Sequence, residues 1–183
     1  MVVQLIAHTN DPEKTVAAAA KLCYSDAHIE TLLDGLTPDK TAAFLQKLTD
    51  LGHASPIEHA SFTFGIEGVS RTFLAQVTRH RIASFSVQSQ RYVRLEDFRY
   101  VIPPEIEAIP EAKAQFIDAM NADAQKYLEL VQSLEDAHTR RLMAQGMEEK
   151  AARAKASKQA NEDARFVLPN ACETKMVMTM NCR

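Results

Sequence analysis

Glycine is scarce in this chain of 183 residues, which contains five, none of them in a GxGxxG or P-loop pattern. In those patterns, the backbone amides of a glycine-rich loop bind the phosphates of a nucleotide. Their absence excludes these two kinds of nucleotide site. Any bound phosphate must therefore be neutralised by side chains, and arginine suits that role best because its planar guanidinium presents several donors.

Cysteine is also rare, and long apolar runs are missing. The three cysteines, Cys23, Cys172 and Cys182, are widely spaced and form no CxxC pair. This usage argues against a disulfide framework or a zinc knuckle and favours a reducing compartment. The N-terminal apolar run is too short for a signal peptide, and no run approaches the roughly 18 residues of a membrane span. We expect a soluble, cytoplasmic protein that binds no membrane.

The composition is that of a globular protein, with 46% apolar and 25% charged residues, and its length suits one domain over residues 1–183. The net charge is only −3, which does not favour nucleic acid as a partner. Residues 71–99 carry six arginines against Glu96 and Asp97, a local net charge of +4, so the remainder carries −7. This asymmetry indicates a focused anion site.

The pattern of apolar residues predicts a mixed α+β domain. We expect strands at residues 2–8, 60–69 and 98–102, because their apolar residues alternate or cluster over short runs. Asp11 and Thr37 are predicted to cap two helices that begin at Pro12 and Pro38, the second ending at Gly52.

Further helices are predicted towards the C-terminus. Ser70 is expected to cap a short helix over residues 71–80, and a long helix is expected at 110–136. Residues 143–169 are alanine-rich and helical in pattern, with a strongly polar, solvated face. The fold class that follows is α+β, with helices and an antiparallel sheet in a single domain.

The stretch "RHRIASFSVQSQRY" contains three arginines, three serines and a histidine but no acid. Arg79 and Arg81 flank His80, while Ser89 and Arg91 stand two apart and point alike if the chain is extended. A hydroxyl beside a guanidinium is suited to clamp a phosphate. Surface salt bridges are the competing interpretation, but nearby acids are too few to pair every arginine. We therefore favour an anion site.

A second polar cluster lies in "GHASPIEHASF", with His53, Ser55, Glu58 and His59. Three interpretations remain open: a metal site, an acid–base pair, or ligand contacts near a helix end. A histidine pair six residues apart does not match HExxH or a closed zinc pattern. Structural hydrogen bonding by a lone histidine is a further alternative.

The C-terminal segment "ARFVLPNACETKMVMTMNCR" contains Arg165 before an apolar run that we expect to be buried. Its methionines Met176, Met178 and Met180 alternate, as core residues of a strand do. No cysteine lies near a histidine in sequence, and Ser89 lacks the GxSxG pattern of a nucleophile elbow. Neither type of nucleophile is predicted.

Taken together, these segments resemble the flavin-dependent thymidylate synthases. "RHRIASFSVQSQR" matches the signature RHR, seven residues, SxR, and "GHASPIEHASFTF" resembles the segment that precedes it. "LIAHTNDPEKTVAAAAKLCYSD" and "ARFVLP…TMNCR" are similar to the N-terminal and third blocks of that family. The similarity is collinear over nearly the whole chain.

The resemblance implies an enzyme that methylates dUMP to dTMP. The carbon donor would be methylenetetrahydrofolate, reduced FAD would supply the hydride, and NADPH would reduce the flavin. The resemblance further implies a homotetramer whose active sites are shared between subunits. The residues themselves leave one alternative open, which is a non-catalytic nucleotide- or RNA-binding module that uses the same arginines.

The resemblance also implies site residues, with no metal ligand among them. The predicted FAD contacts are His53, Ser55, Arg79, His80, Arg81, Val87, Asn181, Cys182 and Arg183. The predicted dUMP contacts are Gln76, Val77, Thr78, Arg79, Val87, Gln88, Ser89, Gln90, Arg91 and Arg165. Ser89 and Arg91 would hold the phosphate, and residues 76–79 and 87–91 of one site would come from different subunits.

Two departures from the family pattern stand out. Many members carry asparagine and glutamate where this chain has Ser86 and Val87, so position 87 supplies no carboxylate. The family also continues beyond the position of Arg183 into a helix with an arginine that polarises the uracil ring. We therefore expect a C-terminally truncated chain, assign no catalytic residue within it, and expect binding rather than turnover.

Overall fold

The computed structural model describes residues 1–91 and 98–183. Contacts within the chain gather into two compact units. The first unit comprises Met1–Glu67, Thr78–Ser86 and Met176–Arg183, and the second comprises Gly68–Val77 and Val87–Lys175. That residues 1–183 form one domain stays a prediction.

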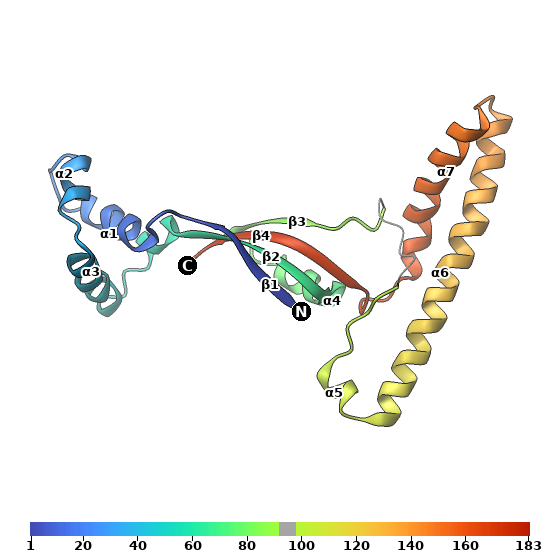
Figure 1. The fold of residues 1–183 in the computed structure, drawn as a ribbon, viewed down its shortest axis with the longest axis horizontal. Coiled ribbons are helices and arrows are strands. Elements are labelled where there is room, and N and C mark those ends of the chain that lie inside the picture. The colour runs from blue at the N-terminus through green and yellow to red at the C-terminus, as the bar shows by residue number, and fades with distance from the viewer. Residues whose placement is uncertain (92–97) are drawn as a thin grey trace. The chain divides into compact units, whose positions relative to one another are not determined.

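A four-stranded sheet has the order β1-β2-β4-β3, with strands β1 (Val2–His8), β2 (Ser61–Ser70), β3 (Ala83–Val87) and β4 (Glu173–Asn181) (Figure 1). β1 pairs with β2 in antiparallel register. β4 is also antiparallel to β2, because the Cys182 N–H donates to the Ala60 carbonyl at one end and the Arg71 N–H donates to the Cys172 carbonyl at the other. The predicted α+β class is confirmed.

The first unit packs helices α1 (Pro12–Leu22), α2 (Ile29–Asp34), α3 (Pro38–Asp50) and the 3₁₀ helix η1 (Ser55–His59). α1 contacts the other three and buries a face that consists of Val16, Ala17 and Ala20. The side chains of Asp11 and Thr37 do not make the predicted cap hydrogen bonds. Proline at the first position, which has no N–H to satisfy, marks both helix starts instead.

The second unit contains α4 (Arg71–Val77), α5 (Pro104–Glu107), α6 (Pro110–Ala144), α7 (Glu149–Ala164) and the 3₁₀ helix η2 (Arg165–Val167). The predicted cap of α4 is confirmed, since the Phe73 N–H donates to the Ser70 hydroxyl over 3.1 Å. α4 nevertheless ends at Val77 rather than at residue 80.

Two predictions of regular structure are wrong. Residues 98–102 form no strand, because Tyr100 makes only an isolated bridge with Cys172 and Pro103 follows closely. The helical pattern of residues 143–169 is interrupted: α6 extends eight residues beyond the predicted end at 136, and Gly146, with φ of 89°, turns the chain before α7 begins. The short helices α2 and α5 were not predicted.

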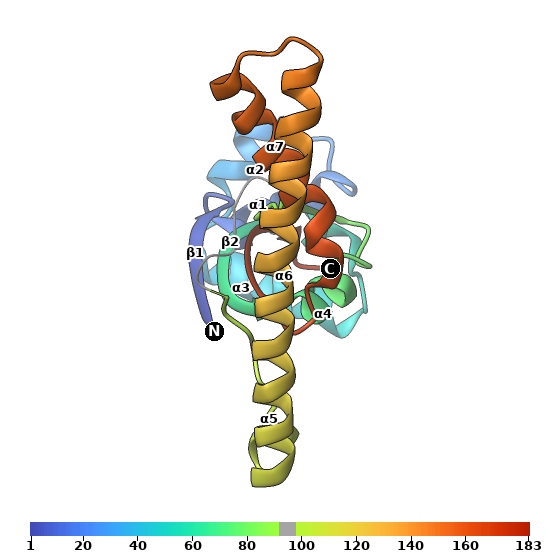
Figure 2. The same ribbon diagram turned by 90° about the vertical axis from the view of Figure 1, so that its right-hand side faces the viewer.

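The long helices α6 and α7 lie side by side and form the core of the second unit (Figure 2). Every fourth residue along one face of α7 is a buried alanine: Ala152, Ala156, Ala160 and Ala164. Small side chains at this spacing let the helix backbones approach closely, and they pack against Tyr127, Val131 and Leu142 of α6. Phe166 is 83% exposed, so the prediction that the whole "FVLP" run is buried is wrong.

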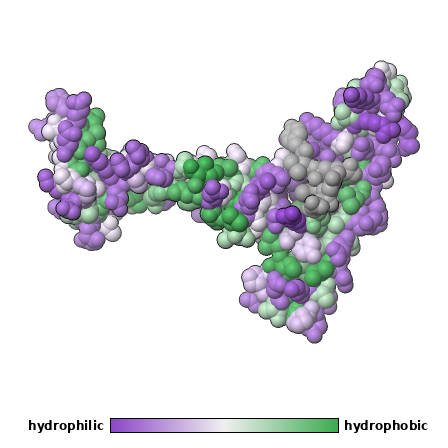
Figure 3. Space-filling model, in the orientation of Figure 1, coloured by the Kyte–Doolittle hydropathy of each residue, from purple (hydrophilic) through white to green (hydrophobic). Residues whose placement is uncertain are grey.

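The outer faces of α6 and α7 are polar, and hydrophilic residues dominate where these helices are visible in Figure 3. Lys150, Arg153, Lys155 and Lys158 of α7 are all exposed, which confirms the predicted solvated face. None of the helices within residues 1–91 and 98–183 is both long enough and apolar enough to cross a membrane.

The alanine face of α7 predicts a sharp dependence of stability on side-chain size. Ala160→Leu should lower the free energy of unfolding by about 1–3 kcal/mol, because the larger side chain has no room beside Tyr127 and Val131. The control is Ala154→Leu, on the exposed side of the same helix, which should change stability by less than about 0.5 kcal/mol. Urea unfolding measures both, and equal effects would contradict the packing described.

Candidate functional site

In the second unit, a short loop after β3 carries Ser89, Gln90 and Arg91. The loop follows directly from the strand, because the Gln88 N–H donates to the Lys175 carbonyl over 3.0 Å. The Ser89 hydroxyl accepts the Arg91 N–H over 3.2 Å, which fixes the turn between them. A hydroxyl that accepts one hydrogen bond can donate another, so Ser89 stays suited to bind a phosphate.

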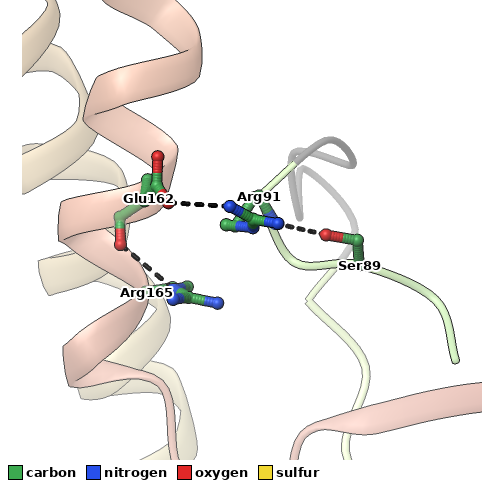
Figure 4. Close-up of polar contacts among 4 residues, drawn as sticks. All are labelled: Ser89, Arg91, Glu162 and Arg165. Atoms are coloured by element: carbon green, nitrogen blue, oxygen red, sulfur yellow. Dashed lines mark hydrogen bonds and ion pairs between the residues drawn. The ribbon is translucent and has the colours of Figure 1, made fainter.

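Arg91 lies against the C-terminal end of α7 (Figure 4). Its Nη1 donates to Oε1 of Glu162 over 3.0 Å, and both side chains are about 40% exposed. The Nε of Arg165 donates to the backbone carbonyl of the same Glu162 over 3.1 Å. Two guanidinium groups that the sequence separates by 74 positions are thus tied to one residue, and we call Ser89, Arg91, Glu162 and Arg165 the arginine cluster.

The arginine cluster contains two positive charges and one negative charge. Its ion pair is partly exposed, so its contribution to stability is small. Guanidinium groups bind phosphate oxygens with two parallel hydrogen bonds, and the Ser89 hydroxyl adds a neutral donor. The cluster can therefore bind an anion of phosphate size.

In the same unit, α4 carries Gln76, which is exposed, and Val77, which is half-buried. The start of this helix is held by the segment before β4, since the Thr72 N–H donates to the Asn170 carbonyl over 3.0 Å. Val87, half-buried, is the last residue of β3. These predicted dUMP contacts lie in the same unit as the arginine cluster.

Cys172, which Gln90 of the loop after β3 contacts, is fully buried. Burial raises the pKa of its thiol, although a hydrogen bond from Gln90 Nε2, at 3.8 Å from Sγ, acts in the opposite direction. A buried thiol with a raised pKa is a poor nucleophile. This agrees with the absence of a predicted cysteine nucleophile, and it gives Gln90 a structural contact.

In the first unit, His53 and Ser55 are placed by the end of α3. Gly52 has φ of 71°, its N–H donates to the Thr49 carbonyl, and the His53 N–H donates to the Leu48 carbonyl. This is the Schellman arrangement, which needs glycine at the left-handed position. The predicted stop at Gly52 is confirmed, and both His53 and Ser55, the first residue of η1, are exposed.

The C-terminal residues 181–183 lie against η1. The Cys182 N–H donates to the Ala60 carbonyl over 3.0 Å, and the Arg183 guanidinium forms an ion pair with Glu58. The Arg183 N–H also donates to Oδ1 of Asn181 over 3.1 Å. Two sequence segments that the resemblance assigns to the flavin are therefore adjacent in the fold.

A cavity of about 260 Å³ lies between α1, α3 and η1. His53 and Cys182 both line it, although 129 positions separate them in sequence. The remaining lining is mostly apolar and includes Val16, Leu48 and Ile57. An apolar cavity with a few polar groups at its edge is typical of a cofactor or ligand site.

Arg79, His80 and Arg81 belong to the first unit and are exposed. Across residues 1–91 and 98–183, neither arginine forms an ion pair with a carboxylate. Thr78, which precedes them, is exposed as well. Of the predicted patch, Arg94, Glu96 and Asp97 lie outside the described residues.

The alternatives left open for the cluster around His53 can now be compared. Glu58 is engaged by Arg183 rather than by a histidine. In the part of the chain that the structure describes, no three histidine, cysteine, aspartate or glutamate side chains gather as metal ligands. Contact with a ligand at the adjoining cavity is the interpretation that the geometry favours.

The two units divide the predicted contacts almost by ligand. Every predicted FAD contact except Val87 lies in the first unit, and every predicted dUMP contact except Thr78 and Arg79 lies in the second.

The sequence analysis did not predict a role for Glu162. A signal was present, since Glu162 and Asp163 place two acids in the last turn of α7, where the helix dipole disfavours negative charge.

Comparison with known proteins identifies relatives of this chain. The family model described as thymidylate synthase complementing protein matches residues 4–183. The protein named flavin-dependent thymidylate synthase from Clostridium tetani is 49% identical over 181 residues, which cover 99% of this chain and 70% of the relative.

Two further relatives carry the same name. The protein from Geobacter sulfurreducens is 45% identical and covers 100% of this chain, and that from Nitratidesulfovibrio vulgaris is 44% identical and covers 99%. The chain spans 69% of the length of each. The family resemblance inferred from the RHR and SxR residues is confirmed, and the chain belongs to the thymidylate synthase complementing protein family.

Proposed function

We propose that this chain acts in the flavin-dependent methylation of dUMP to dTMP. The observation that carries the proposal is the arginine cluster, in which guanidinium groups from two distant segments both donate to Glu162 and the Ser89 hydroxyl accepts the N–H of Arg91. These are the donors that a phosphate dianion on a small nucleotide requires. The relatives' shared name supports the pyrimidine substrate and the flavin.

The residues of the first unit fit a flavin nucleotide. Arg79 and Arg81, which form no ion pair within the described residues, suit the diphosphate of FAD, because buried or bound phosphates need neutralising partners. The apolar cavity beside His53 and Cys182 suits an aromatic ring system. We assign FAD to these residues together with Ser55, His80, Val87, Asn181 and Arg183.

When bound, the reduced flavin supplies a hydride, and the protein contributes binding and orientation. Ser89, Arg91 and Arg165 hold the phosphate of dUMP, while residues 76–79, Val87, Gln88 and Gln90 surround the nucleoside. We propose methylenetetrahydrofolate as the carbon donor and NADPH as the source of reducing equivalents. The alternative of a non-catalytic nucleotide- or RNA-binding module has no support, because the relatives carry the name of an enzyme.

We also propose that the protein is a cytoplasmic homotetramer with shared active sites. The edge strand β1 supports association, because four of its apolar residues are between 48% and 60% exposed: Val2 (60%), Val3 (54%), Leu5 (48%) and Ile6 (56%). An exposed apolar edge is otherwise an aggregation hazard. Light scattering should give four times the chain mass of 20.4 kDa, whereas the mass of a single chain would contradict the proposal.

Flavin binding is tested by removing the RHR guanidinium groups. Arg79→Ala and Arg81→Ala should each weaken FAD binding by at least about tenfold, because each removes a charge-assisted hydrogen bond to a phosphate. The readout is visible flavin absorbance that stays with the protein through gel filtration. Arg153→Ala, which removes an exposed arginine paired with Glu149, is the matched control and should retain flavin. Full flavin retention by both RHR variants would remove these arginines from the site.

Nucleotide binding is tested at the arginine cluster. Arg91→Ala should weaken dUMP binding by about 1.5–3 kcal/mol, the usual contribution of a hydrogen bond to a charged group. Isothermal titration of the FAD-loaded protein measures the dissociation constant, again with Arg153→Ala as the control. Deoxyuridine, which lacks the phosphate, should bind the variant and the wild type equally. An unchanged dUMP constant would exclude Arg91 from the phosphate site.

A further inference from the structure

Glu162 contacts both of the arginines assigned to the phosphate, and it does so through two different groups. Its carboxylate accepts from Nη1 of Arg91 over 3.0 Å, and its backbone carbonyl accepts from Nε of Arg165 over 3.1 Å (Figure 4). The two arginines come from a loop after β3 and from the end of α7, so no local sequence rule brings them together. Glu162 is the residue through which their positions are linked.

An arginine side chain loses considerable conformational entropy when it is fixed, because several bonds rotate freely. Arg91 is 42% exposed, so packing alone does not immobilise its guanidinium. An acceptor at Nη1 restricts those rotations before any ligand arrives. A guanidinium has five N–H donors, so a hydrogen bond from Nη1 to Glu162 is compatible with phosphate binding by the same group.

The negative charge of Glu162 does not stabilise the helix that carries it. It stands in the last turn of α7, which contains no basic residue, and negative charge is unfavourable at the C-terminal end of a helix dipole. A glutamine there would keep the helix propensity without that penalty. The presence of a carboxylate at this position is better explained by its contact with Arg91.

A carboxylate near a phosphate also has an opposing effect, because the two negative charges repel each other. Here two guanidinium groups accompany one carboxylate, so the local charge stays positive. The pair is partly exposed, so salt screens both the repulsion and the ion pair, while the hydrogen bond from Nη1 still directs the Arg91 guanidinium. The gain from orienting the Arg91 guanidinium is therefore expected to outweigh the repulsion between the Glu162 carboxylate and the phosphate.

We propose that Glu162 is a positioning residue for nucleotide monophosphate binding: its carboxylate orients Arg91 while its backbone carbonyl orients Arg165. This inference rests on the proposed function, in that the monophosphate is that of dUMP. It assigns Glu162 no contact with the substrate. Its effect passes through the arginines alone.

The test compares variants of the FAD-loaded protein by isothermal titration with dUMP and with deoxyuridine. Glu162→Ala should raise the dUMP dissociation constant by about tenfold, within the range of coupling in a hydrogen-bonded network. Glu162→Gln keeps an oxygen that can accept from Arg91, so the dUMP dissociation constant of this variant should rise by no more than about threefold. Deoxyuridine binding should be unchanged in both, because no phosphate is involved.

The matched control is Glu149→Ala, which removes an exposed carboxylate from the first turn of the same helix, where it pairs with Arg153. It changes the net charge as Glu162→Ala does but leaves the arginine cluster intact, so dUMP binding should not change. In an Arg91→Ala background, Glu162→Ala should cause no further loss, because the residue acts through Arg91.

Three outcomes would overturn the inference. Unchanged or tighter dUMP binding by Glu162→Ala would mean that the carboxylate competes with the phosphate instead of orienting its ligand. Equal weakening of dUMP and deoxyuridine would indicate a general structural defect. A further loss in the Arg91→Ala background would show that Glu162 acts by another route. If the wild type itself fails to bind dUMP, the proposed function fails instead, so the two failures are distinguishable.

Discussion

The close packing of α7 on α6 is the constraint on which the arginine cluster depends. Alanine at every fourth position of α7 lets the two helices meet over several turns, with Tyr127 and Val131 filling the space between them. Because α7 is held along this face, its C-terminal turn has a fixed position within the second unit. Glu162 and Arg165 lie at that end of the helix, and Arg91 is tied to it by its ion pair with Glu162.

Much of the local structure could be predicted because it depends on few neighbouring residues. Proline at the start of α1 and α3, the Ser70 cap of α4 and the left-handed Gly52 are each set by chemistry within one turn of chain. The Schellman end of α3 even determines where the His53 backbone lies. The two sets of ligand contacts were implied by the family resemblance of short motifs, and they stay predictions.

What could not be predicted depends on pairing between distant segments. Arg91 and Glu162 are 71 positions apart, and Arg183 and Glu58 are 125 apart, so neither ion pair leaves a local pattern. The "FRYVI" run has the composition of a strand, yet Tyr100 finds only one bridging partner, which propensity alone does not reveal. The extent of α6 was underestimated because the polar residues after Asp136 lie on its exposed face, while Thr139 and Leu142 stay buried.

The arginines of the two units differ in a way that bears on how each ligand is held. Arg91 already forms an ion pair with the carboxylate of Glu162, which orients its guanidinium. A phosphate that binds Arg91 must compete with that carboxylate, at a modest cost. Arg79 and Arg81 form no such ion pair among the described residues, so the proposed FAD phosphates would meet no competing carboxylate from that part of the chain. Under the proposed assignments, Arg91 would be oriented before its ligand arrives, whereas Arg79 and Arg81 would be ordered by theirs.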